Sequence, residues 1–234
     1  MAKGNLLDLF DKDGTRLYET GVANCALFVY DVTNSDYGKT SQEGGVCWNG
    51  ITSISESPSG AEANPIYADN MKYLNLFSAE EFGATIEAYT YPDEFALCDG
   101  SAELVAGAYF GQQPRKMFGL AYKTKEGNDV VGEAYSEKLH IIYGAKASPS
   151  EKQYQTINDS PEAITFSWEL TTTPVKFTID GVQYNTANIV VDKAKVGATK
   201  YAALEKVIYG EGDASTGTGG YLPLPDEVKT ILQA

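Results

Sequence analysis

The side chains with the widest chemical repertoire are few and scattered along this chain. There is one histidine, His140, which lies inside the apolar stretch KLHIIYG. A Ser-His-Asp or Cys-His catalytic device would have to use this residue, and no nucleophile motif surrounds it. We therefore expect His140 to be structural. The three cysteines, Cys25, Cys47 and Cys98, have neither metal-ligand nor redox spacing. We therefore expect each of them to be buried and to act as a small apolar residue.

Carboxylates are the one abundant reactive group, with 32 aspartates and glutamates. Glu87 and Glu169 occupy polar positions of predicted strands, and paired carboxylates are the equipment of glycoside hydrolases. With so many acids some pair always looks suitable, so the pattern has little specificity. The DKDG segment at 11–14 lacks the remaining ligands of a calcium loop. The GTGG segment at 217–220 lacks the lysine of a phosphate loop. The sequence thus predicts no metal, no cofactor and no catalysis.

The composition is globular and strongly acidic, with 43% hydrophobic residues and a net charge of −14. An acidic excess argues against direct nucleic-acid binding, which needs Lys and Arg to replace counterions. It favours solubility, and it would also keep a surface from adhering to DNA that slides past it. No apolar run approaches the roughly 20 residues of a membrane span. Asp8 and Asp11 interrupt the first apolar stretch too early for a signal peptide, so we expect synthesis in the cytoplasm.

Strand patterns predict a mainly β protein, an antiparallel β-sandwich with one flanking α-helix, a long loop and terminal arms. The clearest strand is 163–172, where Phe166, Trp168 and Leu170 alternate with polar residues. Further strands are expected at 26–30, 48–57, 72–78, 81–90, 117–124, 138–145 and 188–191, and a hairpin at 175–184 that turns around Asp180-Gly181. The expected core contains Phe28, Trp48, Phe82, Ile86, Phe166, Trp168 and Leu204.

Helical periodicity appears near the C-terminus, where the apolar residues of 198–209 recur at helical spacing before Gly210. A last helical turn is expected to open at Pro225, with two acids at its positive end. These patterns divide the chain into an N-terminal arm (1–23), a β-sandwich domain (24–210) and a C-terminal linker and arm (211–234).

The segment PSGAEANPIYADN, residues 58–70, is expected to be a long polar loop because it contains two prolines and a glycine. A loop of this length inside a compact domain usually has an interaction role. We expect a contact between subunits through Pro58, Glu62, Pro65, Tyr67, Asp69 and Asn70.

Four stretches, residues 58–100, 111–124, 137–175 and LPLPDEV at 222–228, resemble the major tail tube proteins of long-tailed, non-contractile bacteriophages. The resemblance implies a β-sandwich subunit of the virion that forms rings, usually hexameric. It implies that the rings stack into a hollow tube around a tape measure protein, and that DNA later passes through the lumen without specific binding. It also implies contacts with a tail terminator and with distal tail or baseplate proteins.

In that picture exposed strand edges pair between subunits to close a ring, and head-to-tail contacts then generate an open filament. The 58–70 segment and the two tails would make the stacking contacts, and Glu87 and Glu169 are candidates for the lumen wall.

Two alternatives stay open. The 16 tyrosines, among them Tyr67, Tyr73, Tyr89, Tyr91 and Tyr135 near loops, also suit a carbohydrate-binding β-sandwich on the virion. The other alternative is a hydrolase that uses Glu87 and Glu169.

Overall fold

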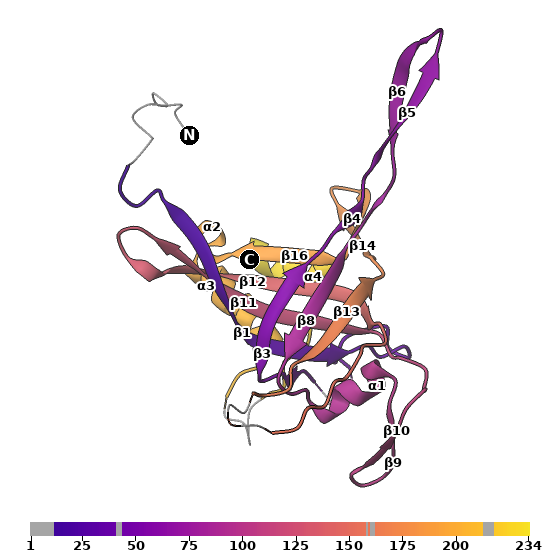
Figure 1. Cartoon of the computed structure of the whole chain (residues 1–234). Coiled ribbons are helices and arrows are strands. Elements are labelled where there is room, and N and C mark those ends of the chain that lie inside the picture. Colours follow the sequence, from indigo (N-terminus) through magenta and orange to yellow (C-terminus); the bar gives the residue numbers. More distant parts are fainter. Residues whose placement is uncertain (1–11, 41–43, 158, 160–161, 213–217) are drawn as a thin grey trace.

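The body of the protein is one antiparallel sheet of eight strands in a computed structural model that describes residues 12–40, 44–157, 159, 162–212 and 218–234 (Figure 1). The predicted mainly β, antiparallel fold is confirmed. The spatial order is β2 (Val46–Cys47), β1 (Leu17–Val29), β11 (Phe118–Asn128), β12 (Gly132–Ala147), β13 (Phe166–Thr172), β8 (Gly83–Ala88) and β3 (Ile51–Glu56). The eighth strand, β16 (Asn188–Asp192), pairs with β12 on the same edge as β13.

The sheet folds over itself, so that β13, β8 and β3 form one layer and β1, β11, β12 and β16 form the other. A first hydrophobic core fills the space between the layers. Trp168 of β13 is fully buried there, and its ring meets the rings of Trp48 and Phe95 at centroid distances of 5.6 and 5.1 Å. Such alternating inward side chains from both layers are what hold a sandwich together.

The turn of the sheet between its two layers depends on Gly144, near the end of β12. Its φ of +62° is in the left-handed region, and a Cβ added there would lie 2.0 Å from the carbonyl oxygen of Thr173. The amide of Gly144 donates to the Tyr37 hydroxyl (2.9 Å), and its carbonyl accepts from the amide of Thr173 (2.9 Å). Beyond this point β12 leaves β16 and pairs with β13.

Gly144→Ala is therefore expected to lower the free energy of unfolding by about 2–4 kcal/mol, from left-handed strain and the clash together. Urea denaturation followed by circular dichroism measures this. Gly111→Ala is the matched control, because nothing lies within 4 Å of its added Cβ. Equal midpoints for the two variants would contradict this account of the bend.

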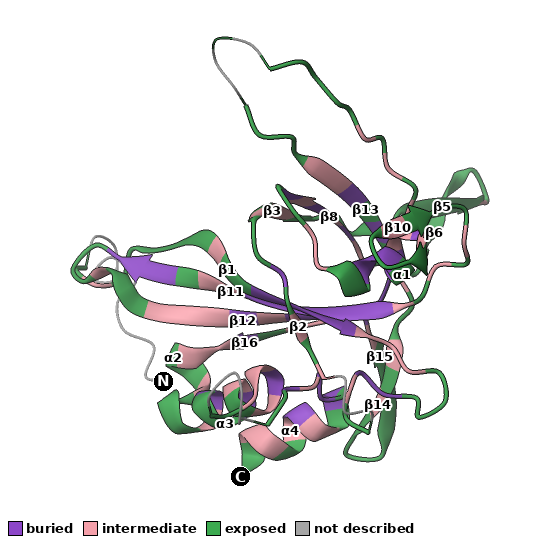
Figure 2. Ribbon diagram, turned by 90° about the horizontal axis from the view of Figure 1, so that it is seen from below, coloured by how far each residue is buried: buried purple, intermediate pink, exposed green. Residues whose placement is uncertain are grey.

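A second core lies on the other face of β1, β11 and β12, under α3 (Ala198–Tyr209) and α4 (Pro225–Gln233) (Figure 2). Helix α3 has the bounds that the periodicity predicts, and a short helix, α2 (Lys193–Val196), precedes it. The buried members include Phe28, Tyr143, Tyr201, Leu204, Ile208, Leu222 and Val228. The layer of β1, β11 and β12 is thus covered on both faces.

Both predicted terminal arms need correction. Strand β1 starts at Leu17 and pairs with β11 through register shifts, so the expected arm 1–23 includes part of the sheet; residues 1–11 lie outside the described residues. The C-terminal residues from 220 onward are packed on the body, because Leu222 and Val228 belong to the second core. Of the expected linker 211–220, residues 213–217 also lie outside the described residues.

The remaining elements are short helices and hairpins. The segment after β8 contains a 3-10 turn, η2 (Asp93–Phe95), followed by α1 (Ala96–Asp99). The paired strands are β4 (Ser59–Gly60) with β7 (Glu80–Glu81), β5 (Ala63–Ala68) with β6 (Met71–Phe77), β9 (Ala102–Val105) with β10 (Ala108–Phe110), and β14 (Val175–Ile179) with β15 (Val182–Thr186).

Among the residues expected in the core, five are buried: Phe28, Trp48, Ile86, Trp168 and Leu204. Phe82 and Phe166 are partly buried and pack against the first core. Cys25 and Cys98 are buried, and burial raises the pKa of each thiol to about 12. Cys47 is exposed, contrary to expectation, because it lies on the two-residue edge strand β2.

Candidate functional site

Residues 59–81 form an arm that leaves the body as two successive β ladders (Figure 1). At its tip, Asp69 and Asn70 both have positive φ, +52° and +61°, as the turn of a two-residue hairpin requires. The prediction of a loop at 58–70 is therefore wrong, because most of this segment forms one strand of a β-hairpin. Pro65 is compatible with β5 because the strand has a partner on one side only.

The arm exposes many large apolar side chains. Tyr67, Met71, Tyr73 and Phe77 are each 65–69% exposed, and Ile66, Leu74 and Leu76 are exposed as well. An isolated two-stranded hairpin is only marginally stable in water, and contiguous exposed apolar surface marks interaction sites. The arm is therefore a candidate interaction surface. The six expected contact residues, Pro58, Glu62, Pro65, Tyr67, Asp69 and Asn70, are all exposed on it or at its base.

The apolar residues of the arm cover both of its faces. Ile66 lies opposite Leu74 and Asn64 opposite Leu76, so these side chains share one face. Tyr67 shares the opposite face with its cross-strand partner, Lys72. A partner could thus pack against either side of the arm.

A second surface is the outer face of the β13–β8–β3 layer, which carries both Glu87 and Glu169. Glu87 lies opposite Ser167 and Glu169 opposite Thr85, so the two carboxylates are diagonal neighbours on one face. Ser53 of β3 donates a hydrogen bond to Glu87 (2.9 Å). The same register adds Ser55 and Thr171 to this face.

This surface, the polar face, consists of short hydroxyl side chains and carboxylates. None of the three strands contains lysine or arginine. A polyanion would therefore find no cation to bind in these strands.

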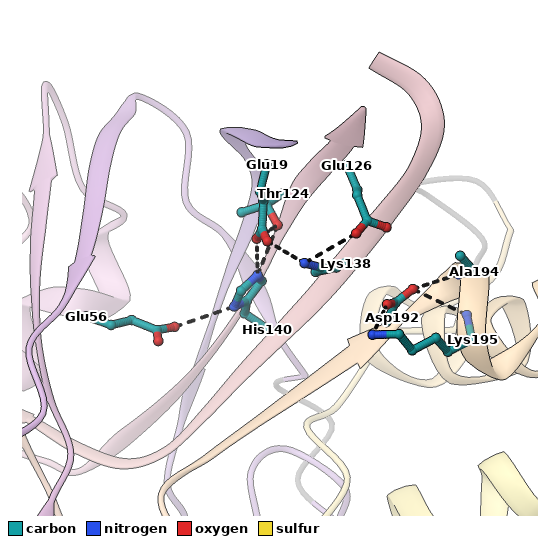
Figure 3. Close-up of polar contacts among 9 residues, drawn as sticks. All are labelled: Glu19, Glu56, Thr124, Glu126, Lys138, His140, Asp192, Ala194 and Lys195. Carbon is teal, nitrogen blue, oxygen red and sulfur yellow. Dashed lines mark hydrogen bonds and ion pairs between the residues drawn. The ribbon is translucent and has the colours of Figure 1, made fainter. Parts of the chain in front are cut away.

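The lone histidine, His140, lies in a polar cluster that joins four strands (Figure 3). Its Nε2 is 3.3 Å from Glu19 of β1, and its Nδ1 is 3.5 Å from Glu56 of β3. The imidazole stacks on Tyr122 of β11, with the centroids 4.7 Å apart and the planes 7° apart. Thr124 contacts its Nε2 at 3.0 Å.

The acids of this cluster are held in their charged form. The interaction with His140 and a hydrogen bond from the Tyr122 hydroxyl (2.7 Å) keep the pKa of Glu56 below its usual 4.5. At Glu19 burial opposes ionisation, but hydrogen bonds from Lys138 and Thr124 outweigh it, and the pKa is again lowered. The cluster therefore connects the start of β1 and the end of β3 to the central strands, a structural role for His140.

Glu56→Gln should consequently lower stability at neutral pH by about 1 kcal/mol, because a neutral amide oxygen replaces the charged acceptor of the Tyr122 hydroxyl. A lowered folded-state pKa stabilises the fold above the unfolded-state value near 4.5, and this contribution is lost as pH falls through the folded-state pKa. The gap in melting temperature between wild type and Glu56→Gln should thus close in acid. Tyr122→Phe removes the hydrogen bond itself, along with its effect on the pKa of Glu56, and should follow the same trend. A gap that widened on acidification would contradict it.

No protein-family model matches this chain, and no curated protein is significantly similar to it. Within the part of the chain that the structure describes, no three histidine, cysteine or acidic side chains gather as a metal site. Nor does any helix of the described residues have the length and apolar character to cross a membrane.

The β9–β10 hairpin is an exposed element that the sequence patterns did not lead us to predict. Leu104 and Val105 on one strand and Tyr109 and Phe110 on the other are exposed, Leu104 to 72%. The signal was present, because two short apolar runs flank Ala-Gly at 106–107. The hairpin therefore adds a second apolar projection to the molecule.

A groove of about 550 Å³ adjoins the segment that leads from β10 to β11. Its apolar walls include Val29, Val32 and Met117. Its cations are Arg115, Lys116 and Lys146. Arg115 is held in place by Asp99 (3.8 Å) and by the carbonyl of Ala147 (2.9 Å). Asp31 is the one acid among the residues that line it, so the three cations outnumber the acids there in a chain with net charge −14.

Proposed function

We propose that this protein is a structural subunit that assembles with copies of itself into stacked rings, forming the hollow tail tube of a bacteriophage. The arm of residues 59–81 is the observation that carries the proposal. It extends from the folded body and displays apolar residues on both faces, which is costly for a protein that stays alone in water. Burial against neighbouring copies removes that cost.

Free sheet edges support ring formation. Within the described residues, β3 forms a ladder only with β8, and β16 only with β12. Such edges present unpaired backbone N–H and C=O groups that can pair with another chain. Pairing between neighbours around a closed ring satisfies those groups, and six copies is the number that the family resemblance implies.

The polar face supports a role as the wall of a channel. Glu87 and Glu169 lie on it together, among serine and threonine side chains and without a lysine or arginine from the same strands. A lumen lined this way repels DNA phosphates and gives them no ion pairs, so DNA would move past without adhering.

The partners in this proposal are the protein itself, a tape measure protein inside the tube, and a tail terminator and distal tail or baseplate proteins at its ends. The subunit would be made in the host cytoplasm and reside in the virion.

Negative-stain microscopy of the purified protein, with and without its tape measure protein, tests the proposal. Rings or tubes with a central channel are expected. A strictly monomeric particle under every condition would contradict it.

A carbohydrate-binding module is the alternative that the exposed tyrosines favour. Tyr67 and Tyr73 lie on the arm, whereas Tyr91 packs against Phe166 and Trp168 beside the first core. The tyrosines thus belong to separate elements, whereas a sugar platform needs aromatic rings on one surface. A glycan array that shows specific binding by the monomer would favour this alternative.

A further inference from the structure

We infer that the arm of one copy packs along the β9–β10 hairpin of the next copy, and that this contact stacks the tube. The inference rests on the proposed function and specifies which two surfaces of the chain meet. Both are hairpins that expose apolar side chains, and each needs cover from another molecule.

The directions of the two hairpins make a head-to-tail contact possible. In Figure 1 the arm rises from the upper end of the sandwich, and the β9–β10 hairpin extends from its lower end. Figure 2 looks from below at the same molecule, and there β5, β6 and β10 overlap on one side. The two hairpins therefore extend in opposite directions along nearly one line. Moving a second copy along that line brings its β9–β10 hairpin to the arm of the first.

The lengths and charges of the hairpins agree with a side-by-side overlap. Eleven extended residues from base to tip give the arm a reach of roughly 35 Å, which exceeds the short β9–β10 hairpin. In the overlap the arm's tip, with Asp69, lies near the base of the other hairpin, where Lys116 and Lys146 line the groove. The tip of β9–β10 then lies near the arm's base.

A second copy is the occupant that best explains the pairing. One chain carries both apolar surfaces at opposite ends. The contact therefore joins two different surfaces of neighbouring copies, which makes it heterologous. A heterologous contact that repeats by translation does not close, and it produces a filament of indefinite length. An unrelated partner would account for one hairpin and leave the other exposed.

Two variants test the pairing. Tyr67→Ser with Met71→Ser disables the arm, and Leu104→Ser with Phe110→Ser disables the receiving hairpin. All four residues are exposed, so both variants should keep the wild-type fold and melting temperature. Each variant alone should need a concentration higher by roughly 100-fold to form tubes, because two interface apolar residues are lost. Val131→Ser, an exposed apolar residue in another turn, is the control and should assemble normally.

Mixing the two variants is the decisive step, because each retains the surface that the other lacks. The mixture should give discrete complexes of two units, whether rings or subunits, and no long tubes. In a Cys47→Ser background, Tyr67→Cys and Tyr109→Cys together should also form disulfides between copies, since the other two cysteines are buried.

The possible failures are distinguishable. If wild type never assembles, the proposed function fails. If wild type assembles but the β9–β10 variant also forms tubes, or the mixture yields no two-unit complex, the pairing is overturned and tube formation stands. Equal loss of assembly in Val131→Ser would also overturn it, because the effect would not be specific to the two hairpins.

Discussion

Trp168→Ala is expected to lower the free energy of unfolding by about 3–5 kcal/mol, the usual cost of deleting a large buried aromatic side chain. Trp168 is fully buried, and its ring lies within 6 Å of four other aromatic rings. Its indole N–H also donates to Asp99 (3.1 Å), so the substitution removes a hydrogen bond as well as the packing.

The loss extends to the charges around Asp99. This nearly buried carboxylate also binds Lys152 at 2.8 Å and lies 3.8 Å from Arg115. Losing one of its donors in a buried setting adds to the cost of the cavity. Urea denaturation followed by far-UV circular dichroism measures the change, and Tyr73→Ala, at an exposed aromatic residue of the arm, is the control. A urea midpoint of Trp168→Ala equal to that of wild type would contradict the description of the first core.

Replacing residues 59–81 with an Asn-Gly turn is expected to abolish tube assembly while leaving a folded monomer. The deletion ends where β3 and β8 are still paired, because the amide of Ser57 donates to the carbonyl of Gly83 (2.8 Å). Asn-Gly is the preferred two-residue connection between antiparallel strands. The removed residues are exposed except for Ala68, so the two cores are left intact.

Sedimentation and electron microscopy measure assembly of the deletion variant, and thermal unfolding measures its fold. The melting temperature should stay close to that of wild type, while particles larger than a single subunit or ring should disappear. Tubes of normal length from a chain without the arm would show that the stacking contacts lie elsewhere. By contrast, removal of the last residues should unfold the protein, because Leu222 and Val228 belong to the second core.

Elements with strong local periodicity could be predicted from the sequence. Helix α3 follows from Tyr201, Leu204 and Ile208 at helical spacing, and β13 follows from the alternation around Trp168. The same alternation puts Glu87 and Glu169 on polar faces. It cannot say that β8 and β13 are neighbours, because the pairing of strands is set by tertiary packing.

The features that the sequence did not predict depend on contacts distant in the chain or on the absence of contacts. The arm looks like a loop because Pro65 and the exposed residues around it lack the alternation of a half-buried strand. The C-terminal segment looks like a linker because the residues that reach the second core, among them Leu222 and Val228, follow a run of glycine, serine and threonine. The bend at Gly144 requires knowledge that Thr173 lies beside it.

The double covering of β11 and β12 has a consequence for the order in which backbone amides exchange with deuterium. Amides in the central part of these strands, around Leu120 and Ile141, are hydrogen-bonded on a layer that is shielded on both faces, so they should exchange only through global unfolding. Amides of the arm should exchange through local opening, within the earliest time points. If copies cover the arm on assembly, its protection should rise selectively while that of β11 and β12 stays the same. Deuterium uptake of the free and assembled protein would thus locate the stacking contact without any substitution.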